Sequence, residues 1–176
     1  MDAGPAGPGP GGGGVSTAAP VPVLERAFDV HASLGRLEDH GMTRAGHRRV
    51  VPIASGQVSG LFDAHVLPGG ADWQLVRPDG TIEIDTRYSA RTPAGEYVHF
   101  RTSGVRSGPP HILEALLRGD PVDPSEYYFR VAVYLETSAP RLADLQRSLF
   151  VASAIREADQ VHYCLLYTSP SPRDRG

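Results

Sequence analysis

The residues that could carry out chemistry are charged and polar side chains within segments that alternate between polar and apolar residues. Asp72 and Gln74 flank the only tryptophan, Trp73, and Asp85 and Arg87 stand two positions apart in a later segment. Such alternation is typical of half-buried strands, whose successive side chains point to opposite faces. A carboxylate beside an arginine or a tyrosine can transfer protons or bind a polar group of a ligand.

A third polar stripe follows residues 127–137, where Tyr128, Arg130 and Glu136 share one parity and the other parity is apolar. The apolar parity must face a core, whereas the polar parity faces either a lumen or water. Inside a small barrel, the arginines would have to pair with the carboxylates, because an unpaired buried charge costs several kcal/mol. We therefore predict an amphipathic pocket, for which the candidate lining residues are Asp72, Trp73, Gln74, Asp85, Arg87, Tyr128, Arg130 and Glu136.

The alternative interpretation places the same three stripes on the outside of the protein. There they would form cross-strand ion pairs, each contributing less than ~1 kcal/mol. The alternation alone leaves both interpretations open.

No motif for a metal or a nucleophile stands out. The seven histidines include no His-x-His or His-Glu-x-x-His spacing, so a metal site would need ligands from separate strands. The serines at Ser55 and Ser59 lack the Gly-x-Ser-x-Gly turn of a nucleophile elbow. We therefore expect no metal and no cofactor, and the motifs assign no catalytic residue.

Strand signals follow one another along most of the chain. Strands are expected over residues 23–34, 46–53, 57–66, 72–76, 81–92, 96–103, 127–137 and 146–156, with a last one beginning at residue 160. The clear helical stretch is 111–118, where the aliphatic residues fall on one stripe before Gly119. Many antiparallel strands with one short α-helix favour a closed barrel or a sandwich, since closure removes exposed sheet edges.

Composition sets the domain organisation and excludes several partners. Residues 1–20 are rich in Gly, Pro and Ala and are expected to be disordered, which leaves one domain from residue 21 to residue 163. The formal net charge is -3, and no basic patch dominates the sequence. We therefore expect no nucleic acid partner. No apolar run approaches the ~20 residues of a membrane helix and no secretory signal is recognisable. We expect a cytoplasmic protein without a membrane partner, and homo-oligomerisation stays open.

Residues 164–176 have a different character from the rest of the chain. The stretch CLLYTSPSPRD is encoded without a break by a DNA string that looks like a sequencing-library adapter, and it contains the only cysteine, Cys164. We interpret this segment as read-through of an adapter, with the native C-terminus lost near residue 163. Thiol or disulfide chemistry is therefore not argued from Cys164.

Several motifs carry a family resemblance that spans residues 22–163. They are LPGGADWQLVRPDG, GTIEIDTRYSARTPAGEYVHFRTSGVRSGP, DPSEYYFRVAVYLETSAPR and SLFVASAIR, in this order. Together they resemble the domain-of-unknown-function family 3237, also called uncharacterised protein family 0311. The resemblance implies a single antiparallel β-barrel with one short helix, similar in general shape to the calycin and allene-oxide-cyclase barrels.

Two classes of function remain open for such a barrel. The first is the binding of a small, partly apolar molecule in the cavity, which we favour. The second is an enzyme of cyclase, isomerase or hydratase type that uses a lumen carboxylate with an Arg or Tyr partner as general acid/base. A carboxylate deep in the cavity without a matched arginine would favour catalysis, because its pKa would be raised.

Overall fold

The structure is a computed structural model that describes residue 19 and residues 21–169. The described residues form ten strands, one α-helix and two short 3₁₀ helices. In chain order they are β1 (Val23–Leu34), β2 (Glu38–Thr43), β3 (Gly46–Gly60), β4 (Ala64–Val66), β5 (Gly70–Val76), β6 (Ile82–Arg91), β7 (Tyr97–Ser107), α1 (Pro110–Arg118), η1 (Pro124–Glu126), β8 (Tyr128–Thr137), η2 (Pro140–Arg147), β9 (Phe150–Arg156) and β10 (Gln160–Ser169).

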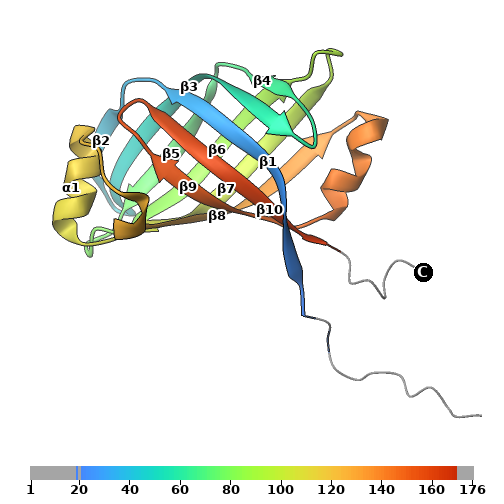
Figure 1. The fold of residues 1–176 in the computed structure, drawn as a ribbon. Coiled ribbons are helices and arrows are strands. Elements are labelled where there is room, and N and C mark those ends of the chain that lie inside the picture. Colours follow the sequence, from blue (N-terminus) through green and yellow to red (C-terminus); the bar gives the residue numbers. More distant parts are fainter. Residues whose placement is uncertain (1–18, 20, 170–176) are drawn as a thin grey trace, which may run out of the picture.

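The strands close into a barrel in which neighbouring strands run antiparallel (Figure 1). The ladder runs β1, β10, β9, β8, β7, β6, then β4 and β5, then β3, which pairs back to β1. β3 is long enough to pair with β1 along one half and with β2 along the other, while β4 and β5 share the place between β3 and β6. The result is an eight-stranded barrel.

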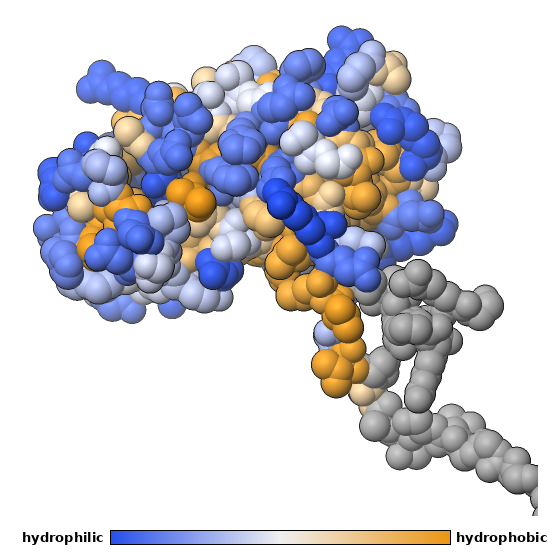
Figure 2. Space-filling view, in the orientation of Figure 1, coloured by the Kyte–Doolittle hydropathy of each residue, from blue (hydrophilic) through white to orange (hydrophobic). Residues whose placement is uncertain are grey.

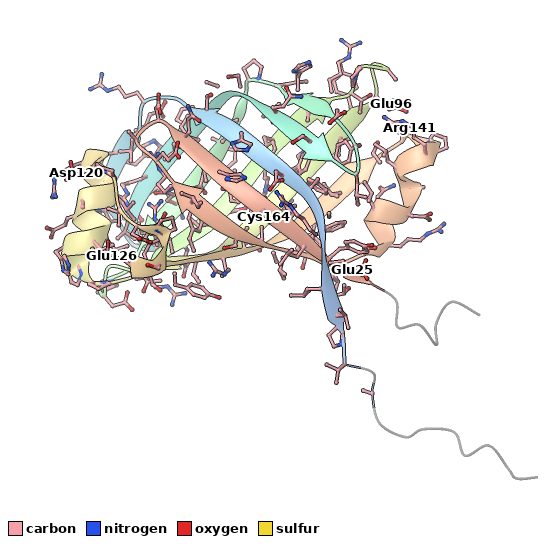
Figure 3. All side chains as sticks on the ribbon, in the orientation of Figure 1. Glu25, Glu96, Asp120, Glu126, Arg141 and Cys164 are labelled. Carbon is pink, nitrogen blue, oxygen red and sulfur yellow. The ribbon has the colours of Figure 1, made fainter. Side chains whose placement is uncertain are left out.

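A helix lies at each end of the barrel: α1 at one end and η2 at the other (Figure 1). α1 buries Ile112 and Leu116 and ends at Gly119, whose φ of 83° is the left-handed conformation that glycine adopts without strain. At the other end, the guanidinium of Arg141 on η2 donates to Glu96 at 3.0 Å (Figure 3). Different elements therefore lie at the two ends, and the α1 end is the one where the site described below lies (Figure 1).

Aromatic side chains fill the half of the lumen farther from α1. Phe28 packs against Phe62, Phe100 and Phe150 with ring centroids 5.2, 6.3 and 5.7 Å apart. Tyr88 stacks on Phe100 at 4.7 Å. Burial of these rings is the main stabilising contribution of this half.

The antiparallel barrel and the helix over residues 111–118 are confirmed. Several details differ from the sequence expectation, among them β2 and the two 3₁₀ helices, for which no element was expected. Residues 46–60 form one continuous strand, and the strand expected over 146–156 begins only at Phe150. Pro140 opens a 3₁₀ helix, and Gln146 bonds the backbone N–H and C=O of Thr137 at 3.2 and 2.9 Å, which holds this segment off the ladder.

The last described strand pairs along most of its length with β1. Leu165, in the segment interpreted as adapter read-through, is 1% exposed and lies opposite Phe28. Residues beyond Ser169, and the N-terminal segment expected to be disordered apart from residue 19, lie outside the described residues.

The visible outer surface is largely hydrophilic, whereas the N-terminal end of β1 protrudes and is apolar (Figure 2). Val23 and Leu24 there are 60% and 50% exposed. None of the helices in the described ranges has the length and apolar character needed to cross a membrane.

Candidate functional site

A cluster of buried polar side chains occupies the half of the lumen nearer α1. β5 places Asp72 and Gln74 inside the barrel, because the alternation that turns Trp73 outward turns its neighbours inward. β6 adds Thr86, which lies opposite Asp72 in the ladder, and β7 adds Arg106. These four inward residues are 8% exposed or less.

Asp72 is held without an ion pair. Its Oδ2 accepts a hydrogen bond from Nε2 of Gln74 at 2.7 Å, and its Oδ1 accepts one from the backbone N–H of Asp85 at 3.2 Å. Burial raises the pKa of Asp72, while these bonds and the charge of Arg106 offset part of that rise. Asp72 is therefore a carboxyl group that favours its protonated form more than an exposed aspartate does.

Arg106 is a buried guanidinium that none of the described carboxylates approaches within ion-pair distance. It lies over the ring of Phe129 at 5.4 Å, and its Nε atom has no hydrogen-bond partner among the described residues. Burial lowers the pKa of Arg106 to about 10, and the nearby charge of Arg156 acts in the same direction. Arg106 still carries its charge at neutral pH, so the lumen holds a cation at an energetic cost.

Two further arginines lie near Arg106. Arg156 on β9 is partly buried, donates to the backbone carbonyl of Gln160 at 3.1 Å, and has a pKa lowered by burial. Arg49 on β3 is 5% exposed, lies opposite Gln74 in the ladder, and also has a buried Nε without a partner within the described part of the chain. The cluster therefore has more cationic than anionic groups.

Tyr163 and Thr86 complete the polar wall. Burial raises the pKa of Tyr163, and the neighbouring charge of Asp72 raises it further, so the phenol stays protonated. The Oγ1 atom of Thr86 is buried and makes no hydrogen bond of ordinary geometry to any described residue, although the hydroxyl is close enough to affect the pKa of both Asp72 and Tyr163.

A cavity of about 410 Å³ opens at the α1 end and leads to this cluster. Its walls come from α1, from the connection between β1 and β2, from the turn between β9 and β10, and from the barrel itself. They comprise Leu34, Gly35, Arg36, Leu37, Val51, Gln74, Arg106, Leu116, Leu117, Arg156, Ala158 and Asp159. A recess of about 20 Å³ touches both Arg106 and Asp72, and this is room for about one water molecule.

The structure divides the residues that the sequence placed in one pocket. Asp72 and Gln74 lie in the lumen, whereas Trp73 on the same strand is 39% exposed on the outside. Asp85 and Arg87 are on the outer face of β6 and approach each other at 3.6 Å. The expectation that one pocket holds all the candidate residues is therefore corrected for Trp73, Asp85 and Arg87, whose side chains lie on the outside of the barrel.

Tyr128, Arg130 and Glu136 on β8 are also outside the lumen. The reason is that Phe129, Val131, Val133 and Leu135 fill the barrel interior, so the polar parity of this strand must face outward. The guanidinium of Arg130 lies 5.2 Å from the ring centroid of Tyr128, beside a shallow outer groove.

Sequence reasoning missed Arg49, Arg106, Arg156 and Tyr163 as members of a site. The signal for Arg106 lay in the alternation of Val98, Phe100 and Thr102, which reaches residue 106 once β7 is extended beyond residue 103. Thr86 was visible as the polar interruption on the apolar side of its strand. No local pattern pointed to Arg156 or Tyr163, because both reach the cluster from strands that are distant in sequence.

Among the described residues, no group of three or more His, Cys, Asp or Glu side chains is arranged to hold a metal ion. The cluster and its cavity offer a buried carboxyl group whose pKa is raised by burial, three lining arginines (Arg36, Arg106 and Arg156) and leucines at the mouth. This combination can orient a small molecule and exchange a proton with it.

Comparison with known proteins places the chain in a family. The model of a family described as a protein of unknown function, DUF3237, matches residues 22–167. A UPF0311 protein of Bradyrhizobium diazoefficiens is 40% identical over 134 residues, which cover 76% of this chain and 88% of the relative. The crystal structure of a conserved protein of unknown function from Rhodopseudomonas palustris matches with a TM-score of 0.81 at 37% identity, covering 86% of this chain and 100% of that chain.

A second crystal structure supports the same assignment. A protein of Acinetobacter baumannii described as beta-barrel like matches with a TM-score of 0.77 at 33% identity, covering 88% of this chain and 100% of that chain. The chain therefore belongs to the DUF3237 family, whose curated relatives carry the name UPF0311.

Proposed function

We propose that the protein binds a small, partly apolar molecule in the cavity at the α1 end of the barrel. The observation that carries the proposal is Arg106, a buried cation that faces this cavity without an ion pair to any described carboxylate. Keeping such a charge in the lumen costs free energy, so a structural role alone accounts for it poorly. A bound molecule would supply the missing partner.

The walls of the cavity suit a ligand of mixed character. Leu34, Leu116 and Leu117 give it an apolar mouth, and Gln74 with Arg106 gives it a polar inner wall. A volume of about 410 Å³ is within the range of small-molecule sites.

A fragment screen followed by protein-observed NMR would test the binding. Fragments should perturb residues around the cavity, and Leu117→Trp should weaken their binding, because Leu117 lines the mouth and a larger ring there would obstruct it. Leu61→Trp is the matched control, since Leu61 is similarly exposed but lies in the turn between β3 and β4, outside the cavity lining. Fragments that bind elsewhere, or equally well to Leu117→Trp, would contradict the proposal.

The second candidate function is general acid/base catalysis by Asp72 on the bound molecule. One observation favours it: Asp72 is buried, has no arginine within ion-pair distance among the described residues, and has a pKa raised by burial. The recess beside Asp72 is large enough for a water molecule that could carry a proton between the carboxyl group and the cavity. Cyclisation, isomerisation and hydration are the reaction types that such a proton transfer serves.

Asp72→Asn separates binding from catalysis. The asparagine keeps the shape of the side chain and removes its titration, so a pure binding protein should retain affinity for its fragments. A catalyst should retain affinity and lose turnover when candidate substrates are followed by mass spectrometry. Equal turnover by Asp72→Asn and the parent protein would rule out the catalytic role.

A further inference from the structure

We infer that the ligand of this cavity is an organic anion: a carboxylate group carried on an apolar body, with the carboxylate bound by Arg106 and Arg156. The inference rests on the proposed function, because it names the chemical class of the molecule that the cavity would take. It is carried by the balance of charges at the inner wall and by the apolar lining of the mouth.

The inner wall has an excess of cationic groups. Arg106 and Arg156 both line the cavity, and Arg49 lies close enough to Arg106 to affect its pKa. The carboxylates that act on Arg106 and Arg156 are Asp72, buried behind Gln74, and Asp159, which is exposed at the mouth, while Asp39 and Asp72 act on Arg49. Neither Asp72 nor Asp159 lies within ion-pair distance of Arg106 or Arg156 among the described residues.

The guanidinium of Arg106 favours a planar oxyanion. Its Cζ atom lies 5.4 Å from the ring centroid of Phe129, and none of the described carboxylates is within ion-pair distance of it. Arg106 lines the cavity, and a carboxylate can accept from two guanidinium N–H groups at the same time. A bidentate contact of this kind would neutralise the charge.

The mouth favours an apolar body on that carboxylate. Leu34, Leu37, Leu116 and Leu117 line the way in, together with Arg36 and Asp159. An inorganic anion would reach the arginines but would leave these side chains uncovered. An aromatic or aliphatic carboxylic acid would contact both the arginines and the leucines.

Binding of cinnamate tests the inference, with cinnamamide as the uncharged molecule of the same shape and inorganic phosphate as the anion without an apolar body. We expect cinnamate to bind at least about tenfold more tightly than cinnamamide by calorimetry, since hydrogen bonds to charged groups carry this much affinity. In Arg106→Met the preference should fall to about one, and Arg106→Lys should keep part of it because a point charge cannot reproduce the bidentate contact. Arg101→Met is the matched control: Arg101 is on the same strand but exposed, so this variant should behave like the parent protein.

A thermal melt of each variant shows that it is folded, and Arg156→Met provides an independent second substitution at the same wall. The inference is overturned if cinnamamide binds as tightly as cinnamate, if phosphate competes with equal affinity, or if Arg106→Met and Arg156→Met both keep the preference. Binding of neutral fragments in the cavity without binding of cinnamate would overturn the inference and leave the proposed function standing. If neither the fragments nor cinnamate occupy the cavity, both fail.

Discussion

At the scale of single residues, the charged side chains buried in the described barrel are Arg49, Asp72 and Arg106, and none of them has an ion pair there. Surface ion pairs such as the one between Asp85 and Arg87 contribute little to stability and are easily replaced. Buried, unpaired charges are different, because each has a desolvation cost that packing alone does not repay. The charged side chains of the lumen cluster therefore lower the stability of the fold.

The pH dependence of stability should report the protonation of Asp72. Burial raises the pKa of Asp72 above 3.8, so between the two values the folded protein binds more protons than the unfolded chain. The stabilisation is present below the unfolded pKa and is lost as the pH rises through the folded pKa. The free energy of unfolding from urea titrations should therefore fall across this window, and fall less in Asp72→Asn.

Asp63→Asn is the control for this measurement, because Asp63 is an exposed carboxylate in the turn between β3 and β4. Its profile should follow that of the parent protein. Identical slopes for Asp72→Asn and the parent protein would mean that Asp72 titrates as an ordinary surface residue.

Arg106→Met should leave the protein as stable as before or more stable, by up to about 2 kcal/mol, because it replaces an unpaired buried charge with an apolar side chain of similar length. Most substitutions at buried positions destabilise by about 1 kcal/mol or more. Chemical denaturation of Arg106→Met beside Arg101→Met measures the difference. A loss of more than about 2 kcal/mol would show that Arg106 is held by a structural interaction that its removal breaks.

At the scale of elements, the site depends on how closely β7 and β8 approach each other. A Cβ atom added at Gly104 would lie 2.6 Å from the Cα of Val131 and closer still to the backbone carbonyl of Arg130. Backbone atoms cannot move aside as a flexible side chain can. The absence of a side chain at Gly104 therefore allows the ladder that carries Arg106 to form.

Gly104→Ala should destabilise the barrel by at least about 2 kcal/mol, because the two strands would have to separate around the new methyl group. Ser103→Ala, at an exposed neighbouring position on β7, should change stability by less than about 0.5 kcal/mol. Thermal and urea unfolding of the two variants provide the comparison. Equal stabilities would contradict the close approach of the strands.

Alternation along each strand was enough to predict the antiparallel barrel and to sort side chains onto two faces. It could not say which face is the lumen when both faces carry polar residues. On β8 the apolar side chains around Phe129 and Val131 fill the interior, so Arg130 is outside. On β5 the polar pair Asp72 and Gln74 faces inward instead, held by hydrogen bonds and by the field of Arg106.

The residues that favour a lumen position for Asp72 and Gln74 come from β6, β7 and β10. These strands are far from β5 in the sequence. Thr86 lies opposite Asp72, and Tyr163 adds its phenol from the other end of the chain. The sequence of a single strand does not show that these groups lie next to one another in the lumen. The polar wall of the lumen is for this reason a property of the closed barrel and not of any single motif.

At the scale of the whole molecule, the pairing of β1 with β10 helps to close the barrel around both halves of the lumen. Leu165 is 1% exposed and lies in register with Phe28 on one side and Ala152 on the other. Leu165→Ala should cost about 2–5 kcal/mol through lost burial and the cavity left behind. Leu166→Ala, at the outer groove, should cost less. A similar loss from both substitutions, measured by urea unfolding, would contradict the assigned facing of β10.

The central claim is that the cavity at the α1 end is a binding site whose inner wall recognises an anion. The most direct test is a crystal structure of the full chain grown with cinnamate. The account predicts the carboxylate within hydrogen-bond distance of Arg106 and the ring among Leu34, Leu116 and Leu117. Cinnamate found instead in the outer groove beside Leu24 and Val151, or with its ring against Arg106 and its carboxylate in solvent, would contradict it.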